Sequence, residues 1–505
     1  MIRVLEKLSE HALNFPDKAA LIDEKGVITY REYNDTVQNL ACKICAYFKD
    51  NGKKIPHNEA IAVLVGRNAK SVMAMLGVSM TGNFYVPIDV SLPKNRVAVI
   101  LGQMKPRIII DAVGVTDNKE YEGYPILASD EINGSKTEAD VLSEIETEAS
   151  GNDLIYAVYT SGSTGVPKGV VKAHYSVADF IPIFCRTFSL NSDDVFANQA
   201  PFDFDVSGKD IYSALYLGAT MYVVPQRLFG SPKKLIADLN EKRVTVLIWA
   251  VSALCVAAGM NAFSYEKPEH IRRILFSGEA MPISVLNLWR QVLPEAMYVN
   301  LYGPTEVTYN CTYYIVDREY GFKEMLPMGV PFEHQTVRYV SADGSDIAAG
   351  EEGEVIVSGP SVAVGYYRDE DSTAGTFVTD KAGVRWLHTG DIVRYSQDGQ
   401  YYFSGRRDFQ IKHMGYRIEL EEIEMYLNAL EGVTRAGCLY DKDRGKLVCV
   451  YSGSWDKREI AMCLRDELPK YMLPNVYVRR RELKLNKNGK LDRAGLADDY
   501  IQSLS

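Results

Sequence analysis

Residues 159–170, with the sequence YTSGSTGVPKGV, concentrate the residue types that bind phosphate. Small residues let backbone N–H groups approach an anion, hydroxyls donate hydrogen bonds to phosphate oxygens, and Lys168 adds a positive charge. The string is not a Walker-type P-loop, because Gly169 rather than Ser or Thr follows the lysine. The pattern predicts a phosphate-binding loop that comprises Thr160, Ser161, Gly162, Ser163, Thr164, Gly165 and Lys168.

Three later residues are suited to the other parts of a nucleotide. Tyr302 offers an aromatic face to a purine ring, and Asp391, in a predicted Gly-Asp turn, can accept two hydrogen bonds from ribose hydroxyls. Glu306 is a carboxylate beside Thr305, and Mg²⁺ prefers carboxylate and phosphate oxygens. Each residue alone would also suit a solvated surface, so the argument depends on their occurring together.

The phosphate-binding string resembles that of the adenylate-forming superfamily, which includes amino-acid adenylation domains, acyl-CoA synthetases and luciferase. The resemblance recurs in order along nearly the whole chain, at residues 83–89, 300–306, 353–359, 365–367, 389–391, 405–412, 415–419 and 488–493. It implies ATP and Mg²⁺ as cofactors, with Glu306 as the magnesium ligand. The nucleotide site that it implies also contains Gly278, Glu279, Asn300, Tyr302, Gly303, Thr305, Asp391 and Arg406.

The resemblance also implies a reaction in two halves. A carboxylate attacks ATP to give an acyl-adenylate and pyrophosphate, and a thiol then displaces AMP to give a thioester. Lys490 matches the family's loop lysine, which bridges the substrate carboxylate and the α-phosphate and would stabilise the pentacovalent phosphorus. A small C-terminal domain would turn between the two halves about the residue that matches Asp408.

Residues 198–207, NQAPFDFDVS, resemble the substrate motif of amino-acid adenylation domains. In that motif an Asp, here Asp205, pairs with the α-ammonium of the substrate; capping of the following helix is the alternative role. The resemblance places the other substrate-binding residues at Val206, Lys209, Ile248, Leu275, Ser277, Leu301, Tyr309 and Asn310.

The layout most resembles D-alanine–carrier protein ligases, but two positions depart from that group. Ser277 stands where those ligases tend to have Cys, and Lys209 where they are usually apolar. Lys209 can turn outward, pair with Asp205, or meet an acceptor on the substrate side chain. We therefore expect the substrate to be a polar or acidic amino acid or (D-)alanine.

The expected thiol partner is a phosphopantetheinylated carrier protein, with CoA as the rival acceptor. The basic cluster of Arg479, Arg480, Arg481, Lys484 and Lys487 would suit docking of an acidic carrier, or is an ordinary solvated face. Two other functions stay open: an acyl- or aryl-CoA synthetase of the same superfamily, against which Asp205 argues, and a non-catalytic binding module.

The elements that must position these residues predict an α/β fold. Apolar strands such as 61–65, 107–111, 221–224 and 273–277 alternate with helical stretches such as 36–48, 69–80 and 232–241, as in layers around parallel sheets. Short alternating strands with frequent turns predict a barrel-like β module at about 326–403. Helices at 419–430 and 457–468 with strands at 436–440 and 447–451 predict a small α+β unit. We expect an adenylation core over residues 1–407 and a mobile domain over 408–505.

Composition limits the remaining classes. A net charge of −10 over 505 residues argues against a general nucleic-acid binder, and eight cysteines are too sparse for a disulfide scaffold. The uncharged run from 244 to 263 would be long enough to span a membrane, but it reads as a buried strand and then a helix capped by Ser252. The charged N-terminal residues do not resemble a signal peptide, so we expect a cytoplasmic protein without a membrane insertion.

Overall fold

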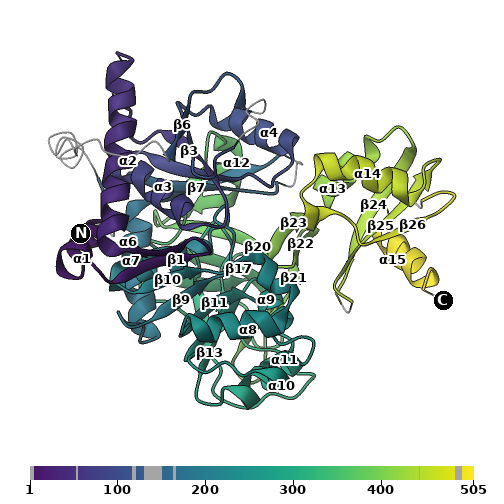
Figure 1. Ribbon diagram of the computed structural model, residues 1–505. Coiled ribbons are helices and arrows are strands. Elements are labelled where there is room, and N and C mark those ends of the chain that lie inside the picture. The colour runs from purple at the N-terminus through teal and green to yellow at the C-terminus, as the bar shows by residue number, and fades with distance from the viewer. Residues whose placement is uncertain are drawn as a thin grey trace. The chain divides into compact units, whose positions relative to one another are not determined.

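The computed structural model describes residues 5–52, 55–115, 121–129, 150–162, 166–442, 444–483 and 492–504 (Figure 1). The chain folds into two compact units. The first comprises Met1–Val90, Met104–Val158 and Gly169–Gly405, and the second comprises Ser91–Gln103, Tyr159–Lys168 and Arg406–Ser505.

A nine-stranded sheet runs through one half of the first unit, as far as the structure describes it. Its six central strands are parallel, and antiparallel strands close both edges. In sheet order the strands are β15 (Val330–Pro331), β14 (Thr312–Ile315), β13 (Met297–Tyr302), β12 (Arg273–Ser277), β11 (Val246–Ala250), β9 (Val195–Asn198), β10 (Thr220–Val223), β1 (Ala19–Asp23) and β2 (Gly26–Thr29).

A second sheet of the first unit has seven strands among the described residues. Its buried strands read as nearly continuous apolar runs, as expected of a parallel sheet that is covered on both faces. In sheet order the strands are β18 (Gly365–Tyr366), β8 (Lys168–Ala173), β7 (Leu154–Thr160), β4 (Phe84–Asp89), β3 (Ala60–Val65), β5 (Ile109–Asp111) and β6 (Ile126–Ala128).

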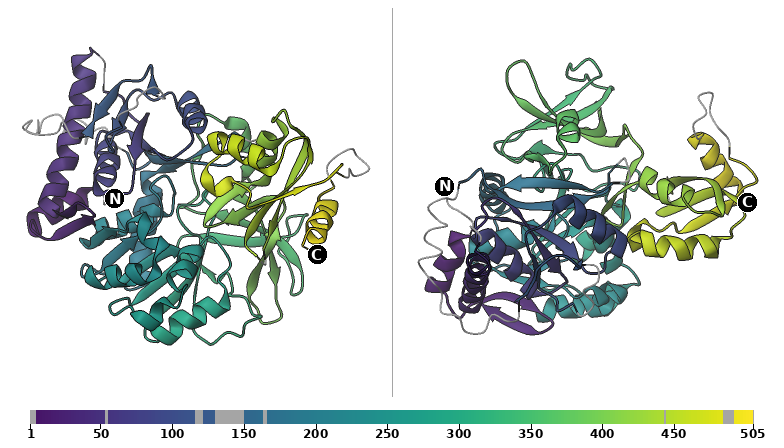
Figure 2. Two further views of the ribbon diagram at one scale, coloured as in Figure 1. Left: turned by 45° about the vertical axis from the view of Figure 1, so that its right-hand side comes forward. Right: turned by 90° about the horizontal axis from the view of Figure 1, so that it is seen from above.

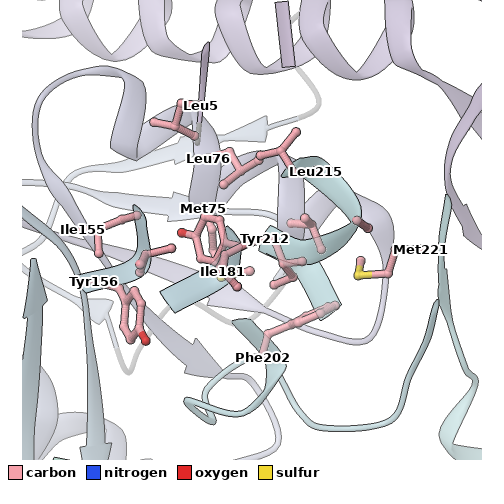
Figure 3. Close-up of a cluster of buried hydrophobic side chains, with 14 of the residues drawn as sticks. Leu5, Met75, Leu76, Ile155, Tyr156, Ile181, Phe202, Tyr212, Leu215 and Met221 are labelled. Carbon is pink, nitrogen blue, oxygen red and sulfur yellow. The ribbon is translucent and has the colours of Figure 1, made fainter. Parts of the chain in front are cut away.

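Helices cover these sheets and pack with them in two hydrophobic clusters. Figure 3 shows Tyr156 of β7 and Tyr212 of the helix Ser207–Leu217 among apolar side chains that include Leu76 and Met221. The helices of this unit are α1 (Glu6–Asn14), α2 (Tyr30–Asp50), α3 (Ala69–Met80), α6 (His174–Thr187), α7 (Ser207–Leu217), η3 (Gln226–Gly230), α8 (Pro232–Glu241), α9 (Val251–Ala257), α10 (Ala262–Tyr265), α11 (Ile283–Val292) and α12 (Glu370–Thr376).

A five-stranded sheet with antiparallel pairing forms the predicted β module. Its strands are β16 (Thr336–Val340), β17 (Glu352–Ser358), β20 (Arg385–Tyr395), β19 (Phe377–Thr379) and β21 (Tyr401–Arg406). Their apolar side chains pack with Tyr302 and Val307 of the first unit in one cluster. The predicted fold class, α/β layers with a barrel-like β module and a small α+β domain, is therefore confirmed.

The second unit contains two small sheets and their helices (Figure 2). β22 (Gln410–His413) pairs with β23 (Tyr416–Glu419), and β24 (Val433–Asp441) pairs with β25 (Lys446–Gly453), which is followed in the sheet by β26 (Val476–Arg479). The helices are α4 (Lys94–Met104), α13 (Leu420–Asn428), α14 (Lys457–Glu467), η4 (Lys470–Met472) and α15 (Arg493–Gln502).

Two local predictions were wrong. Helix α2 begins at Tyr30 rather than Thr36, because Thr29 and Glu32 form a capping box ahead of it. Ser252 is not the cap of α9, since Ala250 occupies the N-cap position without a side-chain cap. Residues 493–502 form α15, for which no helix was predicted. Within the described residues, no helix is long and apolar enough to cross a membrane.

Candidate active site

Asp205 is a buried carboxylate held by two donors from other parts of the first unit. Its Oδ1 accepts a hydrogen bond of 2.6 Å from the Tyr156 hydroxyl, and its Oδ2 accepts one of 3.0 Å from the Tyr309 N–H. The N-cap of α7 is Val206, and no side chain caps that helix. The helix-cap role for Asp205 is therefore wrong, and its carboxylate faces strand β7 and the chain around Tyr309.

Lys209, on the first turn of α7, is fully buried and does not turn outward to solvent. Its Nζ donates to Asn310 Oδ1 at 2.7 Å, which is the one acceptor found for it among the described residues. The Nδ2 of Asn310 is also buried and has no hydrogen-bond partner in the part of the chain that is described. Reversing the Asn310 amide would set two donors against each other, so Oδ1 faces the lysine.

The surroundings of Lys209 carry further charges. Burial lowers the pKa of Lys209 to about 8, and the carboxylates of Asp210 and Asp205 oppose that fall. Burial raises the pKa of Asp210 to about 7, although its Oδ2 accepts a hydrogen bond from Asn198. Burial therefore disfavours the charged forms of both Lys209 and Asp210, and their attraction for each other opposes that effect.

The chain from residue 305 to residue 310, here called the 305–310 segment, joins Glu306 to the residues near Asp205. The Glu306 Oε1 accepts a hydrogen bond of 2.7 Å from the Tyr366 hydroxyl, and the Glu306 carbonyl accepts one from Ala363. Three residues further on, Tyr309 has a φ of 63°, a conformation that is strained for a bulky residue. The segment thus places a buried carboxylate at one end and Tyr309 and Asn310 at the other.

Lys172 of β8 is a second fully buried lysine in this region. Its Nζ donates to the Thr305 carbonyl at 2.5 Å. Burial lowers the pKa of Lys172 to about 8, and the charges of Asp205 and Glu306 act against that fall. Burial likewise raises the pKa of Asp205, and the first of the groups that oppose this rise is Lys172. One ammonium therefore acts on both buried carboxylates.

Asp391 and Tyr302, the proposed ribose and adenine residues, are joined by a buried hydrogen bond. The Tyr302 hydroxyl donates to Asp391 Oδ2 at 2.5 Å, and the Asp391 N–H donates to the Thr389 hydroxyl. Asp391 does not lie in a turn as expected: it lies within strand β20, after Gly390 with a φ of 72°. The register between β17 and β20 shifts at this point. The Gly-Asp pair therefore marks a β-bulge within the strand and not a turn between strands.

The apolar substrate-binding candidates lie on neighbouring strands. Ile248 of β11 and Leu275 of β12 are register partners, and both are buried in the same cluster as Leu301 and Tyr309. Ser277 ends β12 and is buried, whereas Val206 is half-buried. Of these predicted substrate residues, Ser277 and Leu301 lie at or near the carboxyl ends of the adjacent parallel strands β12 and β13, where α/β sheets bind ligands, while Ile248 and Leu275 lie in the middle of β11 and β12.

The remaining nucleotide candidates of the first unit lie within or directly after β12 and β13. Gly278 has a φ of 97° and, with Glu279, comes directly after β12. Asn300 lies in β13 and donates to the Pro327 carbonyl at 2.9 Å. A Cβ on Gly303 would lie 2.6 Å from the Cα of Asn310, so only glycine fits that close approach.

Other predicted residues belong to the second unit. The Ser161 hydroxyl donates to the Arg417 carbonyl at 2.8 Å, beside Thr160 and Gly162, and Lys168 begins β8. Arg406 makes a two-pronged ion pair with Asp408, at 2.6 Å and 2.8 Å. Although partial burial acts to raise it, this guanidinium holds the pKa of Asp408 below its usual value. The predicted residues Ser163, Thr164, Gly165 and Lys490, and also Lys484 and Lys487, lie outside the described residues.

The predicted basic cluster is partly engaged in internal contacts. Arg479 donates to the Gly453 carbonyl, and Arg480 binds Asp499. Arg479 and Arg481 are nevertheless exposed.

Sequence reasoning missed four residues of this region: Lys172, Tyr156, Asp210 and Tyr366. For Lys172 a signal was present, since it is a charged residue inside an otherwise apolar strand, four positions after Lys168. Tyr366 lies in the motif at 365–367 but was given no role there. Tyr156 gave no signal, because aromatic residues are common in buried strands and only the fold directs its hydroxyl at a carboxylate.

The residues present fit a nucleotide-bound magnesium ion. No group of three or more His, Cys, Asp or Glu side chains able to hold a metal occurs among the described residues. Mg²⁺ needs no such cage, since it is commonly bound by one or two carboxylates together with substrate phosphates and water. Glu306, a buried carboxylate oriented by Tyr366, is a donor of this kind.

Known proteins resemble this chain over its whole length. A family model described as "AMP-binding enzyme" matches residues 8–367. A "D-alanine--D-alanyl carrier protein ligase" of Bacillus cytotoxicus is 31% identical over 513 residues, which cover 99% of either chain.

Two solved structures share the fold. The adenylation domain AlmE of Vibrio cholerae, in complex with glycyl-adenosine-5'-phosphate, has a TM-score of 0.82 at 21% identity and covers 100% of this chain and 97% of its own. Holo-PA1221, an NRPS protein containing adenylation and PCP domains, has a TM-score of 0.81 at 23% identity and covers 98% of this chain and 84% of its own.

The family match and the full-length relatives agree with the ordered motifs and with the paired α/β sheets, the β module and the small C-terminal unit. The chain belongs to the AMP-binding enzyme family of the adenylate-forming superfamily, and it is an AMP-forming ligase.

Proposed function

We propose that this ligase activates an α-amino acid as aminoacyl-AMP and then transfers the aminoacyl group to the phosphopantetheine thiol of a carrier protein. The observation that carries the proposal is Asp205, a buried carboxylate held by the Tyr156 hydroxyl and the Tyr309 N–H and not used to cap its helix. Such a group would attract an ammonium and repel the aliphatic or aryl end of a simple carboxylic acid.

The carrier-protein half of the proposal is supported by the relatives. The names of several full-length relatives about 31% identical to this chain include a carrier protein, and PA1221 contains a PCP domain beside its adenylation domain. CoA is the competing acceptor. The exposed arginines Arg479 and Arg481 would suit docking of an acidic carrier.

The side chain of the amino acid is proposed from Lys209 and Asn310. Both present buried N–H donors in excess of the acceptors found among the described residues. Unsatisfied buried donors are costly, so a substrate side chain with an acceptor oxygen would stabilise the site. We therefore favour a polar or acidic amino acid over D-alanine, the amino acid in the names of the relatives.

In this proposal the nucleotide binds along the carboxyl ends of the strands. Thr160–Lys168 would hold the outer phosphates, Asp391 the ribose hydroxyls, Tyr302 the adenine, and Arg406 the ribose and phosphate. Glu306 would hold Mg²⁺, which when bound neutralises charge on the phosphate oxygens.

In this proposal, residues of this chain act in each step of the reaction. Asp205 holds the ammonium so that the substrate carboxylate faces the α-phosphate, and the carboxylate attacks phosphorus without a base. Lys490 would bridge carboxylate and phosphate and stabilise the charge of the transition state. Turning of residues 408–505 about Asp408 would withdraw Lys490 and admit the thiol, which attacks the acyl carbon and releases AMP.

Pyrophosphate exchange into ATP over all L- and D-amino acids tests the proposal, with acyl and aryl acids of similar size as controls. We expect exchange with at least one α-amino acid and loading of a holo carrier protein, but not CoA, in the presence of that acid. Exchange with acyl or aryl acids alone would identify an acyl- or aryl-CoA synthetase. No exchange with any acid would point to a binding module.

A further inference from the structure

The two carboxylates proposed to bind the substrate ammonium and the magnesium ion are buried, and an uncompensated buried charge is strongly destabilising. Asp205 and Glu306 retain 7% and 3% of their exposure. Each accepts a tyrosine hydroxyl, from Tyr156 and from Tyr366. Hydrogen bonds from neutral groups do not cancel a net charge, so the unliganded protein needs a cation of its own near them.

Lys172 is placed to be that cation. It is fully buried and donates at 2.5 Å to the carbonyl of Thr305, the residue before Glu306. The charges of Asp205 and Glu306 raise the pKa of Lys172 against the effect of burial, which lowers it. Its strand β8 pairs with β18, which carries Tyr366, the residue whose hydroxyl holds Glu306. Lys209, the second fully buried lysine among the described residues, also lowers the pKa of Asp205 but comes after Lys172 among the causes, and its Nζ donates to Asn310 at the far end of the 305–310 segment.

The 305–310 segment is thus held at several points by buried polar groups. Lys172 holds its first carbonyl, Asp205 accepts the N–H of Tyr309, and Lys209 holds the Asn310 side chain. The other charged or titratable groups that face this cluster are Asp210, Tyr85, Tyr156, Tyr212, Tyr309 and Tyr366. Lys172 therefore contacts the start of the segment that carries Glu306, and its charge also favours the ionised form of Asp205.

We propose that Lys172 is a positioning residue of the activation half-reaction: its ammonium is the internal counter-charge of Asp205 and Glu306 and fixes the 305–310 segment between them. It acts through these residues and touches neither reacting atom. The expected effect of Lys172 on substrate affinity rests on the proposed function of Asp205. The effect of Lys172 on the charges of Asp205 and Glu306 does not, because it concerns the protein without substrate.

The test separates charge from hydrogen bonding and from packing. Lys172→Met removes the charge and the donor, and Lys172→Gln removes the charge but keeps an N–H for the Thr305 carbonyl. Asp205→Asn and the double variant Lys172→Met/Asp205→Asn complete a double-mutant cycle. Lys234→Met, on the exposed face of α8, is the matched surface control.

Thermal melting of the free proteins is the first readout. We expect Lys172→Met and Lys172→Gln to lower Tm by several degrees, and the double variant to melt above Lys172→Met, because Asp205→Asn removes the orphaned charge. Additive shifts of Tm in the cycle, or a Gln variant that melts like the wild type, would overturn the proposal. So would single variants that fail to fold and are not repaired by Asp205→Asn.

Kinetics of pyrophosphate exchange is the second readout. We expect Lys172→Met to raise KM for the amino acid by about tenfold or more, the factor that corresponds to losing about 1.4 kcal/mol of binding. The double variant should have the KM of Asp205→Asn alone, and Lys234→Met should match the wild type. Equal losses from Lys172→Met in both backgrounds would contradict coupling. A wild type without amino-acid-dependent exchange would refute the proposed function, while the melting cycle would still decide the role of Lys172.

Discussion

A carboxylate just before a helix commonly caps it, but Asp205 does not cap α7. Its partners, Tyr156 and Tyr309, lie 49 and 104 residues away in sequence. No local pattern could have predicted them, whereas the motif resemblance did place Asp205 beside Tyr309 and Asn310. The burial of Lys209 also depends on residues distant in sequence. Its spacing from Asp205 predicted that both lie on one face of a helix, but the packing of α7 against the 305–310 segment is what buries its ammonium.

Lys209→Met tests the polar substrate. If the natural substrate carries a side-chain acceptor, the variant should lose about 1.5–3 kcal/mol of preference for it over alanine, the range for hydrogen bonds to charged groups. The wild-type preference should be present below pH 8 and fall as pH rises through the Lys209 pKa of about 8, because the deprotonated amine loses its charge. Relative kcat/KM values measured between pH 6.5 and 9.5 check both effects. A wild type that prefers alanine, with unchanged or improved activity in the variant, would defeat the idea.

Lys490→Ala tests the proposed bridging lysine. Adenylate formation should fall by about 10²–10³-fold or more, because a charge that stabilises the transition state is lost. Thioester formation from supplied aminoacyl-adenylate should survive. Lys457→Ala, at the start of α14, is the control for loss of a surface lysine. Equal loss in both half-reactions would show that the role of Lys490 is misassigned.

Helices and strands were largely predictable where their signals are local. Strand β12 and helices α3 and α8 have the predicted bounds: β12 is an apolar run, Asn68 caps the start of α3, and α8 begins at Pro232. The start of α2 was missed although its capping box is visible in the sequence, and the bulge before Asp391 was not predictable, because register across β17 and β20 is a long-range property.

Gly208 sets how closely α7 approaches Tyr309. A Cβ there would lie 2.6 Å from Cε1 of the Tyr309 ring, which itself packs edge-to-face on Phe180. Gly208→Ala should destabilise the protein by about 1–3 kcal/mol through overpacking and raise KM for the amino acid. Gly102→Ala, inside α4 with open space around it, should instead be neutral or stabilise by up to about 1 kcal/mol. Thermal melts compare the two, and a harmless Gly208→Ala would mean that the ring moves freely.

At the scale of the whole molecule, the ordered motifs predicted the superfamily and the fold class, since they recur along the chain in a fixed order. The same order does not reveal which residues balance the buried charges. Lys172, Asp205 and Glu306 come from three separate parts of the chain, and only the folded first unit brings Lys172 to the Thr305 carbonyl and Asp205 to the Tyr309 N–H. The split into residues 1–407 and 408–505 as working domains stays a prediction.

Asp408→Pro tests the proposed pivot. A proline restricts φ and should block the turning of the C-terminal residues, so pyrophosphate exchange should persist while transfer to the carrier stops. Asp408→Ala is the control, because it also removes the ion pair with Arg406 but leaves the backbone free. Full transfer by the proline variant, or equal loss of transfer in both variants, would place the pivot elsewhere.

The central claim is that Asp205 selects an α-ammonium. The most direct measurement is the ratio of pyrophosphate-exchange kcat/KM for the best amino acid and its des-amino analogue, in the wild type and in Asp205→Asn. We predict a large ratio in the wild type and a ratio about 30-fold or more smaller in the variant. Loss of one partner of a desolvated charge pair costs about 2–5 kcal/mol, and the lower of these values corresponds to that factor. A ratio that is the same in both proteins, or a wild type that prefers the des-amino acid, would contradict the account.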